Sequence, residues 1–301
     1  MSASVAADGP RVAGAPISWG VCEVPGWGHQ LPPDRVLAEM GALGLTATEF
    51  GPDGYLPSHP SERSALLTRH GLAAAGGFVL ALMHERAVDV AAALDRALAT
   101  FDDGPGGDGP FGKPVLVLAA ATGQDGYDAR PELDADGWSV LLANLDLAAA
   151  RAAERGYLAT LHPHVGTMVE SADDVGRVLD GSQIRLCLDT GHLLIGGTEP
   201  AGLAARAADR IGHVHLKDVT ARLATRVTRG ELSYTDAVRA GLYQPLGQGD
   251  VDVAGVVSAL GQAGYDGWYV LEQDTILTEA PTGEGPAAEV RQSLEYLRAV
   301  L

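Results

Sequence analysis

Short apolar runs alternate with amphipathic stretches along almost the whole chain. Eight runs have the length and composition of buried strands, at residues 12–19, 47–50, 74–82, 115–121, 157–162, 184–188, 211–216 and 268–271. Nine stretches have the spacing of helices with one apolar face, at residues 34–43, 60–70, 87–100, 136–154, 171–179, 200–208, 234–240, 253–263 and 287–300. Strands that alternate with helices are typical of parallel α/β sheets. The pattern predicts one α/β domain, a (β/α)8 TIM barrel over residues 11–301, after a flexible tail at residues 1–10.

Three of these runs end in side chains that can bind a metal ion. They are CLDTGH (187–192), IGHVHLKD (211–218) and VLEQD (270–274), which supply Asp189, His215 and Glu272. Since the active sites of TIM barrels lie at the carboxyl ends of the strands, we expect these three side chains to converge. One Asp, one His and one Glu suit a divalent cation such as Mn, Co, Mg or Zn. Alternatively, Asp189 is a helix cap or a buried ion-pair partner.

Two histidines and a lysine follow one face of the run at 211–216. His213, His215 and Lys217 are each two residues apart, so their side chains point to the same side of a strand. The histidine nearer the carboxyl end should reach the metal, which favours His215 and leaves His213 for inner packing or a supporting contact. Lys217, one of only two lysines, could stabilise an enediolate or move a proton. Alternatively it is a surface residue at the start of a loop.

Three further histidines lie at predicted strand ends. His162 and His164 follow the fifth run in TLHPHVGT; one could be a fourth metal ligand and the other a catalytic acid or base. His192 comes three residues after Asp189. It could contact a substrate oxygen, act as an acid or base, or cap the loop.

Glu49 and two tryptophans are candidates for substrate binding. Glu49 ends the second run, where it could accept a hydrogen bond from a substrate hydroxyl or take part in catalysis, or form an ion pair inside the barrel. Trp19 ends the first run, and with Trp27 it could form an apolar wall for a sugar ring. Core packing is the alternative for both tryptophans.

Three loops stand out by length or composition. The glycine-rich stretch at 103–113 precedes the fourth strand and is expected to be a flexible connection at the opposite end of the barrel. The loop at 20–33 follows the first strand and should face the site. The loop at 218–248 is long for its position, and such loops often close over a substrate.

Composition narrows the class of partner. The chain has 301 residues and a net charge of −18, which argues against binding to nucleic acid or to an anionic membrane. A small polyol or sugar is the expected partner, and a homo-oligomer is possible. Cys22 and Cys187 are predicted to be unpaired, and no apolar run of about 18 residues occurs, so a cytoplasmic location is expected.

At these residues the chain resembles the xylose isomerase-like TIM-barrel superfamily of sugar isomerases and epimerases, and within it the inosose dehydratases and rhizopine-catabolism proteins. The stretches that carry the resemblance are APISWG, TEFGPDGYLP, HPHVGT, CLDTGHLLIGG, HVHLKDV, PLGQGDVD and GWYVLEQD. The resemblance implies a divalent metal held by Asp189, His215 and Glu272, and a substrate contact for His192. The fourth ligand of the superfamily is usually a Glu on the fifth strand. Here Thr160, His162 or His164 stands at or near that place, and His164 is included in the predicted ligand set.

The resulting hypothesis is a metal-dependent dehydration of a cyclic keto-polyol, of the 2-keto-myo-inositol type, through an enediolate. His162 or His164 would take the α-proton, and His192, Lys217 or Glu49 would help the hydroxyl to leave. A sugar isomerase or epimerase, which returns the proton to the same intermediate, is one alternative. A non-catalytic barrel that binds a sugar is another.

Overall fold

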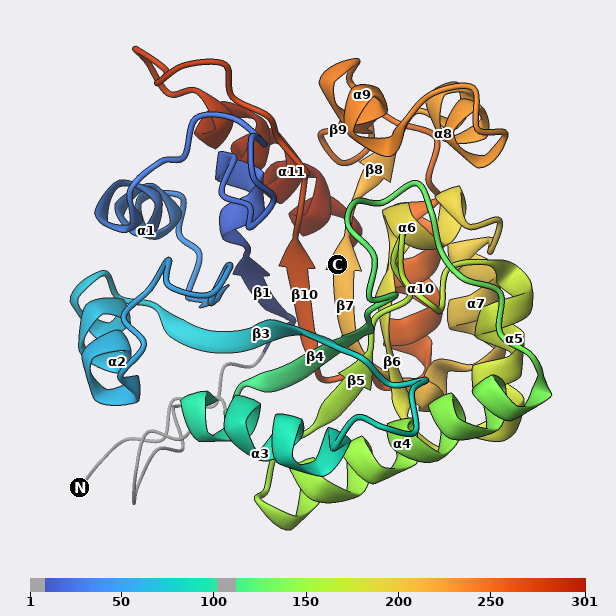
Figure 1. Cartoon of the computed structure of the whole chain (residues 1–301). Coiled ribbons are helices and arrows are strands. Elements are labelled where there is room, and N and C mark those ends of the chain that lie inside the picture. The colour runs from blue at the N-terminus through green and yellow to red at the C-terminus, as the bar shows by residue number, and fades with distance from the viewer. Residues whose placement is uncertain (1–8, 102–111) are drawn as a thin grey trace.

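Eight parallel strands close into a barrel, which confirms the predicted (β/α)8 architecture (Figure 1). The structure, a computed structural model, describes residues 9–101 and 112–301. Around the barrel the strand order is β1–β10–β7–β6–β5–β4–β3–β2. The strands are β1 (Arg11–Gly14), β2 (Ala47–Glu49), β3 (Ala73–Ala81), β4 (Val115–Ala120), β5 (Ala159–Leu161), β6 (Arg185–Asp189), β7 (Ile211–Leu216) and β10 (Trp268–Leu271).

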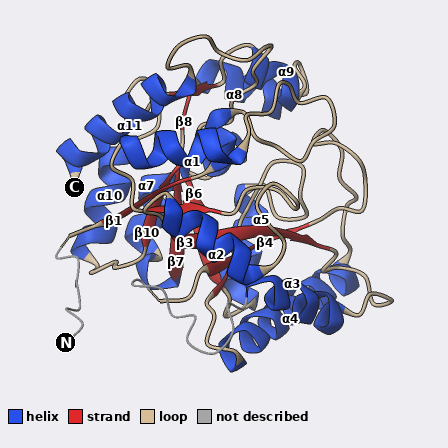
Figure 2. Ribbon diagram, turned by 90° about the vertical axis from the view of Figure 1, so that its left-hand side faces the viewer, coloured by secondary structure: helices blue, strands red, loops and turns tan. Residues whose placement is uncertain are grey.

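Helices surround the strands on the outside (Figure 2). They are α1 (Pro33–Ala42), α2 (Pro60–Arg69), α3 (Val90–Phe101), α4 (Ala135–Glu154), α5 (Ala172–Gly181), α6 (Thr190–Ile195), α7 (Pro200–Arg206), α8 (Ala221–Thr228), α9 (Tyr234–Arg239), α10 (Val253–Gln262) and α11 (Pro286–Val300). In α4 the buried residues recur every three or four positions, at Trp138, Leu141, Leu145, Ala148 and Ala152. This spacing places them on one helix face, which packs toward the barrel. None of the helices in the described ranges is long and apolar enough to cross a membrane.

The register between strands brings the predicted site residues to one level. Asp189 of β6 is paired with His215 of β7, and His215 is paired with Val270 of β10. Glu272 lies two residues beyond Val270, so its side chain points to the same face one step higher. All residues of β7 are buried, including both of its histidines, as expected for a strand covered on both faces. Parallel pairing therefore gathers these residues at the carboxyl end of the barrel.

Some element boundaries differ from those predicted. The first strand ends at Gly14, and a short 3-10 helix (Pro16–Trp19) replaces the rest of the predicted 12–19 strand, because Pro16 has no N–H for the ladder. The fifth strand is shorter than 157–162, and Pro163 follows it closely. The predicted tail at 1–10 and connection at 103–113 lie, except for residues 9–10 and 112–113, outside the described residues. Cys22 and Cys187 are free, as expected.

An added segment follows β7 and lies above its carboxyl end, in orange in Figure 1. Strand β8 (Asp218–Val219) pairs antiparallel with β9 (Tyr243–Gln244), and α8 and α9 lie between them. The Asp218 carboxylate accepts backbone hydrogen bonds at 2.8–3.0 Å from four residues: Val219, Gly247, Gly249 and Val251. A Cβ on Gly249 would lie 2.2 Å from Asp218 Oδ1, so this turn requires glycine. The LGQGDVD stretch thus forms a tight turn wrapped around one buried carboxylate.

Candidate active site

Asp189, His215 and Glu272 converge at the carboxyl ends of β6, β7 and β10. His215 Nδ1 lies 3.6 Å from Asp189 Oδ2 and 3.2 Å from Glu272 Oε2. Asp189 is fully buried, and its other oxygen, Oδ1, accepts a hydrogen bond of 2.8 Å from the backbone N–H of His192 at the start of α6. That bond fixes the carboxylate so that Oδ2 faces the other two side chains.

Glu49 holds His215 from the opposite side of the ring. Its Oε1 accepts hydrogen bonds from His213 Nε2 at 2.8 Å and from His215 Nε2 at 3.0 Å. When His215 is neutral, this contact keeps the proton on Nε2 and leaves the lone pair of Nδ1 aimed at the carboxylates of Asp189 and Glu272. A Cβ on Gly76 would lie 3.0 Å from Glu49 Oε1, so glycine leaves room for this arrangement.

This geometry revises the expected role of Glu49 as an acid or a substrate contact. Burial would raise the pKa of Glu49, but the adjacent His215 and His213 bring it well below its usual range. Glu49 is therefore ionised at neutral pH and cannot readily supply a proton. It lines the cavity, but its Oε1 is committed to two imidazoles.

The donor set suits a divalent metal ion. Asp189, His215 and Glu272 offer ligand atoms that all lie within 4.8 Å of one another. His215 Nδ1 is buried and makes no hydrogen bond within the described residues, although it is 3.2 Å from Glu272. Once the ring is neutral, the lone pair of Nδ1 would face two carboxylates, the arrangement that a bound cation stabilises. The residues present therefore fit such an ion.

His162, rather than His164, lies beside this cluster. His162 Nε2 is 3.2 Å from Asp189 Oδ2, and the two residues belong to a metal-capable group with His192. No metal-capable group in the described part of the chain includes His164. The chain leaves the strand after Leu161 and turns at Pro163, so His164 does not continue the alternation of β5. Thr160 is fully buried one layer deeper and belongs to none of these groups.

His164 instead faces the cavity as a neutral imidazole. Its Nδ1 donates a hydrogen bond of 2.7 Å to the carbonyl oxygen of Val165, so the lone pair of the neutral ring is on Nε2. Burial, together with the neighbouring His162 and Lys217, lowers the pKa of His164 to about 3. The ring stacks on His192 with centroids 3.6 Å apart. His192 was expected to contact substrate, but it lies behind His164 and is not among the residues that line the cavity.

Lys217 is a buried cation among three carboxylates. Its Nζ lies 2.6 Å from Asp274 Oδ1, 3.0 Å from Glu272 Oε2 and 3.6 Å from Asp189 Oδ2. Burial alone would lower the pKa of Lys217, but Asp274, Glu272 and Asp189 raise it well above its ordinary value. The surface alternative for Lys217 is therefore wrong, because only 2% of the residue is exposed and its side chain lines the cavity.

The segment after β7 supports this lysine from behind. Tyr234, from α9, donates a hydrogen bond of 2.6 Å to Asp274 Oδ2, and its hydroxyl is 2.8 Å from that of Tyr243. Both tyrosines are buried. No residue of the segment at 218–248 lines the cavity, so this structure does not show the expected lid.

The cavity at the barrel mouth is partly open to solvent. Its apolar wall includes Ile17, Trp27, Phe78 and Tyr127. Trp19, expected in this wall, is fully buried in the core, and its indole N–H donates to Glu39 at 2.7 Å. The first strand ends early, so Trp19 lies on the 3-10 helix and turns away from the barrel mouth.

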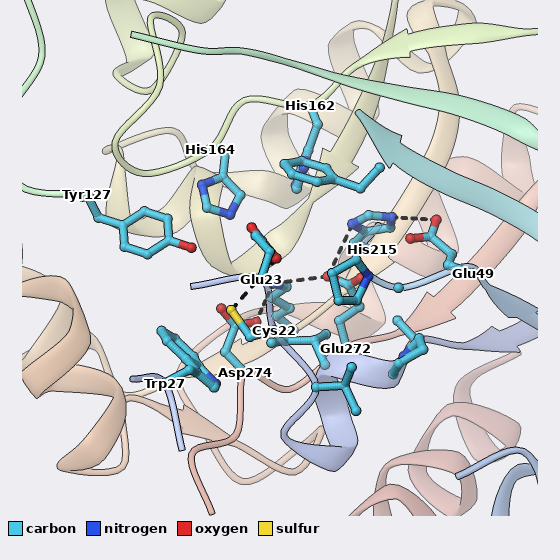
Figure 3. Close-up of a pocket in the computed structure, with 18 residues that line it drawn as sticks. Cys22, Glu23, Trp27, Glu49, Tyr127, His162, His164, His215, Glu272 and Asp274 are labelled. Atoms are coloured by element: carbon cyan, nitrogen blue, oxygen red, sulfur yellow. Dashed lines mark hydrogen bonds and ion pairs between the residues drawn. The ribbon is translucent and has the colours of Figure 1, made fainter. Parts of the chain in front are cut away.

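Several cavity residues were not anticipated from the sequence. They are Cys22, Glu23, Phe78 and Tyr127. Figure 3 shows Cys22, Glu23 and Tyr127 around the pocket together with Asp274 and the predicted His164, His215 and Glu272. Cys22, Glu23 and Tyr127 lie in loops that follow β1 and β4. Their position after a predicted strand could have identified them, because the loops at the carboxyl ends of TIM-barrel strands line the active site.

Known sequences are similar to this chain over most of its length. A family profile described as xylose isomerase-like TIM barrel matches residues 37–300. An inosose dehydratase of Geobacillus kaustophilus (strain HTA426) is 32% identical over 298 residues, covering 95% of this chain and 93% of that relative. The rhizopine catabolism protein MocC of Rhizobium meliloti is 32% identical over 273 residues, covering 88% and 81%. The predicted resemblance to both groups is confirmed.

Solved structures share the fold at lower identity. An L-ribulose 3-epimerase has a TM-score of 0.68 at 17% identity, covering 97% of this chain and 95% of that one. The IolI protein with a bound zinc atom has a TM-score of 0.66 at 14% identity, covering 96% and 97%. With the profile match over residues 37–300 and relatives at 32% identity, this chain is an enzyme that belongs to the xylose isomerase-like TIM barrel family.

Proposed function

We propose that this enzyme removes water from a cyclic keto-polyol of the 2-keto-myo-inositol type, in a metal-dependent reaction through an enediolate. The observation that carries the proposal is the cluster of Asp189, His215 and Glu272 beside a neutral imidazole and a buried ammonium group. The inosose dehydratase at 32% identity over 95% of the chain supports the choice of substrate.

The metal would be held by Asp189, His215 and Glu272, with His162 in place of the usual fifth-strand Glu. A divalent ion such as Mn, Co, Mg or Zn supplies Lewis acidity, which polarises a ketone and makes the neighbouring C–H more acidic. Glu49 contributes by keeping the lone pair of His215 on Nδ1.

His164 and Lys217 would move the two protons. His164 Nε2, whose lone pair is free, takes the proton from the carbon next to the ketone, leaving the enediolate. Because the low pKa of His164 makes it a weak base, this step depends on the acidity that a bound metal would give to that C–H. The C–O bond of the β-hydroxyl then breaks, and Lys217 donates a proton so that the group leaves as water. The resulting enol becomes a dione by tautomerisation. Asp274 orients Lys217 at 2.6 Å for this donation.

The charges around the cavity favour an uncharged substrate. Four carboxylates line it, from Glu23, Glu49, Glu272 and Asp274, against the ammonium group of Lys217. A phosphorylated sugar would bring further negative charge next to these carboxylates, at an electrostatic cost. A neutral polyol avoids this repulsion.

The test is an assay of 2-keto-myo-inositol with the metal-stripped protein, before and after addition of Mn or Co. We expect a dione product and loss of one water only when metal is present. Uptake of solvent deuterium without loss of water would identify an isomerase or epimerase instead. Protein that retains no metal and turns over nothing would support a non-catalytic sugar-binding barrel.

A further inference from the structure

Glu23 differs from the other carboxylates that line the cavity. Glu49, Glu272 and Asp274 are buried, and each is paired with a histidine or a lysine. Glu23 is exposed, and within residues 9–101 and 112–301 its one side-chain hydrogen bond is from Cys22 Sγ, 3.8 Å from Oε2. In Figure 3 its carboxylate points into the pocket, toward the side on which His164 and Tyr127 lie. Glu23 is thus a negative group in the pocket that retains its hydrogen-bonding capacity.

The loop that carries Glu23 is firmly attached to the barrel. Trp27 Nε1 donates to the carbonyl oxygen of Thr275 at 2.9 Å, and the His29 N–H donates to that of Leu277 at 2.7 Å. A Cβ on Gly28 would lie 2.5 Å from the Leu277 oxygen, so the two loops approach as closely as glycine allows. These contacts preset the position of the loop, so substrate binding need not order it first.

The surroundings of Glu23 match the two kinds of surface on a ring polyol. Trp27, Phe78 and Tyr127 present aromatic surface, which packs against the C–H faces of a sugar or cyclitol ring. A free carboxylate has two oxygens that accept hydrogen bonds from hydroxyl groups, and such charge-assisted bonds are stronger than neutral ones. The reacting groups proposed above belong to β5, β7 and their following loops, whereas Glu23 follows β1.

We propose that Glu23 determines substrate specificity by accepting hydrogen bonds from two adjacent hydroxyls of the polyol ring, away from the carbons that react. This inference rests on the proposed function for the identity of the substrate. It assigns Glu23 to recognition, and it leaves metal binding and proton transfer to the residues at the strand ends.

The test compares Glu23→Gln and Glu23→Ala with wild type and with Glu279→Gln, an exposed glutamate outside the pocket. Isothermal titration with myo-inositol, a polyol without the reactive ketone, gives Kd for the metal-loaded proteins. We expect Kd of Glu23→Ala to rise about tenfold or more, because charged hydrogen bonds are lost. KM for 2-keto-myo-inositol should rise similarly, whereas kcat changes less than about twofold. Metal content and the Glu279→Gln control should match wild type.

Unchanged Kd and KM in Glu23→Ala would overturn the inference. So would a collapse of kcat at constant Kd, which would make Glu23 part of the chemistry. If wild type does not bind myo-inositol, the substrate class and the inference fail together. If wild type binds it in a Glu23-dependent way but does not dehydrate 2-keto-myo-inositol, the proposed function fails and the role of Glu23 stands.

Discussion

Two connections at the carboxyl end of the barrel lie next to the candidate site, and the shorter one does more to line it. The β1–α1 loop, at residues 20–32, contributes Val21, Cys22, Glu23 and Trp27 to the cavity wall. The longer segment after β7, at residues 219–252, contributes nothing to that wall. It instead buries Tyr234 behind Asp274.

The difference lies in what each connection packs against. The β1–α1 loop docks on residues 275–277 through Trp27 and His29, and several of its side chains face the pocket. The segment after β7 has its own small sheet and helices, and its backbone is tied to Asp218. The buried side chains of this long connection, Tyr234 and Tyr243 among them, belong to the same hydrophobic core as the barrel, so it packs as a support and loop length alone is a poor guide to a lid.

The largest expected effect comes from a change in the proposed metal cluster, which lies between the two connections. Asp189→Asn keeps the side-chain shape but loses the charge that faces His162, His215 and Lys217. We expect metal affinity to fall at least about a hundredfold, with a parallel loss of turnover. Titration with Mn and elemental analysis after dialysis measure this. Asp209→Asn, at an exposed site, is the control, and full metal retention by Asp189→Asn would contradict the assignment.

The supporting role of the segment after β7 can be tested through stability. Asp218→Ala removes the acceptor of four backbone hydrogen bonds in a buried position. We expect the free energy of unfolding to fall by about 3 kcal/mol or more. Glu23→Ala, in the other connection, should change it by less than about 0.5 kcal/mol. Urea denaturation measures both free energies of unfolding. Equal losses in the two variants would contradict the idea that the segment after β7 supports the fold while the β1–α1 loop only lines the cavity.

Tyr234→Phe tests whether the segment after β7 affects catalysis through Asp274 and Lys217. The change removes the hydrogen bond to Asp274 Oδ2, and Asp274 in turn orients Lys217. We expect kcat to fall about tenfold with KM nearly unchanged, the opposite split from that expected for Glu23. Tyr243→Phe, which removes only the partner hydroxyl of Tyr234, should have a smaller effect. A rise in KM alone would place Tyr234 in substrate binding instead.

A pH series, with an effect of at most about tenfold per pH unit, tests the residues at the strand ends. Burial opposes protonation of His215, but Cys187, Glu272 and Glu49 raise its pKa well above the ordinary value. A metal must displace this proton, so affinity should fall with falling pH, by at most about tenfold per pH unit. Calorimetry at about pH 6 and about pH 8 measures the change around the ordinary histidine pKa.

The same shift affects the protein without metal. Because the folded pKa of His215 is raised above its unfolded value, its stabilisation is present below the unfolded pKa and is lost as pH rises through the folded pKa. The melting temperature of the metal-free protein should therefore fall as pH rises. A pH-independent metal affinity would show that His215 is already neutral.

The sequence alone was sufficient to predict the barrel and the three residues at its centre. Apolar runs ending in Asp189, His215 and Glu272 imply parallel strands, and parallel strands carry their carboxyl ends to one side. The choice of His215 over His213 followed from side-chain alternation, and the register of β6 with β7 agrees with it. These inferences depend on local periodicity, which the chain displays directly.

Other assignments depended on contacts between distant segments. His162 and His164 are both near a strand end in sequence, and only the turn at Pro163 and the position of Asp189 distinguish them. Glu49 orients His215 because it accepts a hydrogen bond from this residue of β7. Trp19 lies in the core because β1 ends early and a 3-10 helix follows it. No periodicity within one segment contains this information.

The sequence by itself thus determined which strands would form and which side chains would stand at their ends, because hydrophobic spacing dictates burial within each element. Only the tertiary structure decided which imidazole lies beside Asp189, which cavity carboxylate makes no ion pair among the described residues, and which loop lines the cavity. Those outcomes depend on hydrogen bonds between Glu49 and His215, between Tyr234 and Asp274, and between Trp27 and Thr275. Each pair joins residues far apart in the chain, and hydrogen-bond geometry selects between arrangements that the sequence leaves open.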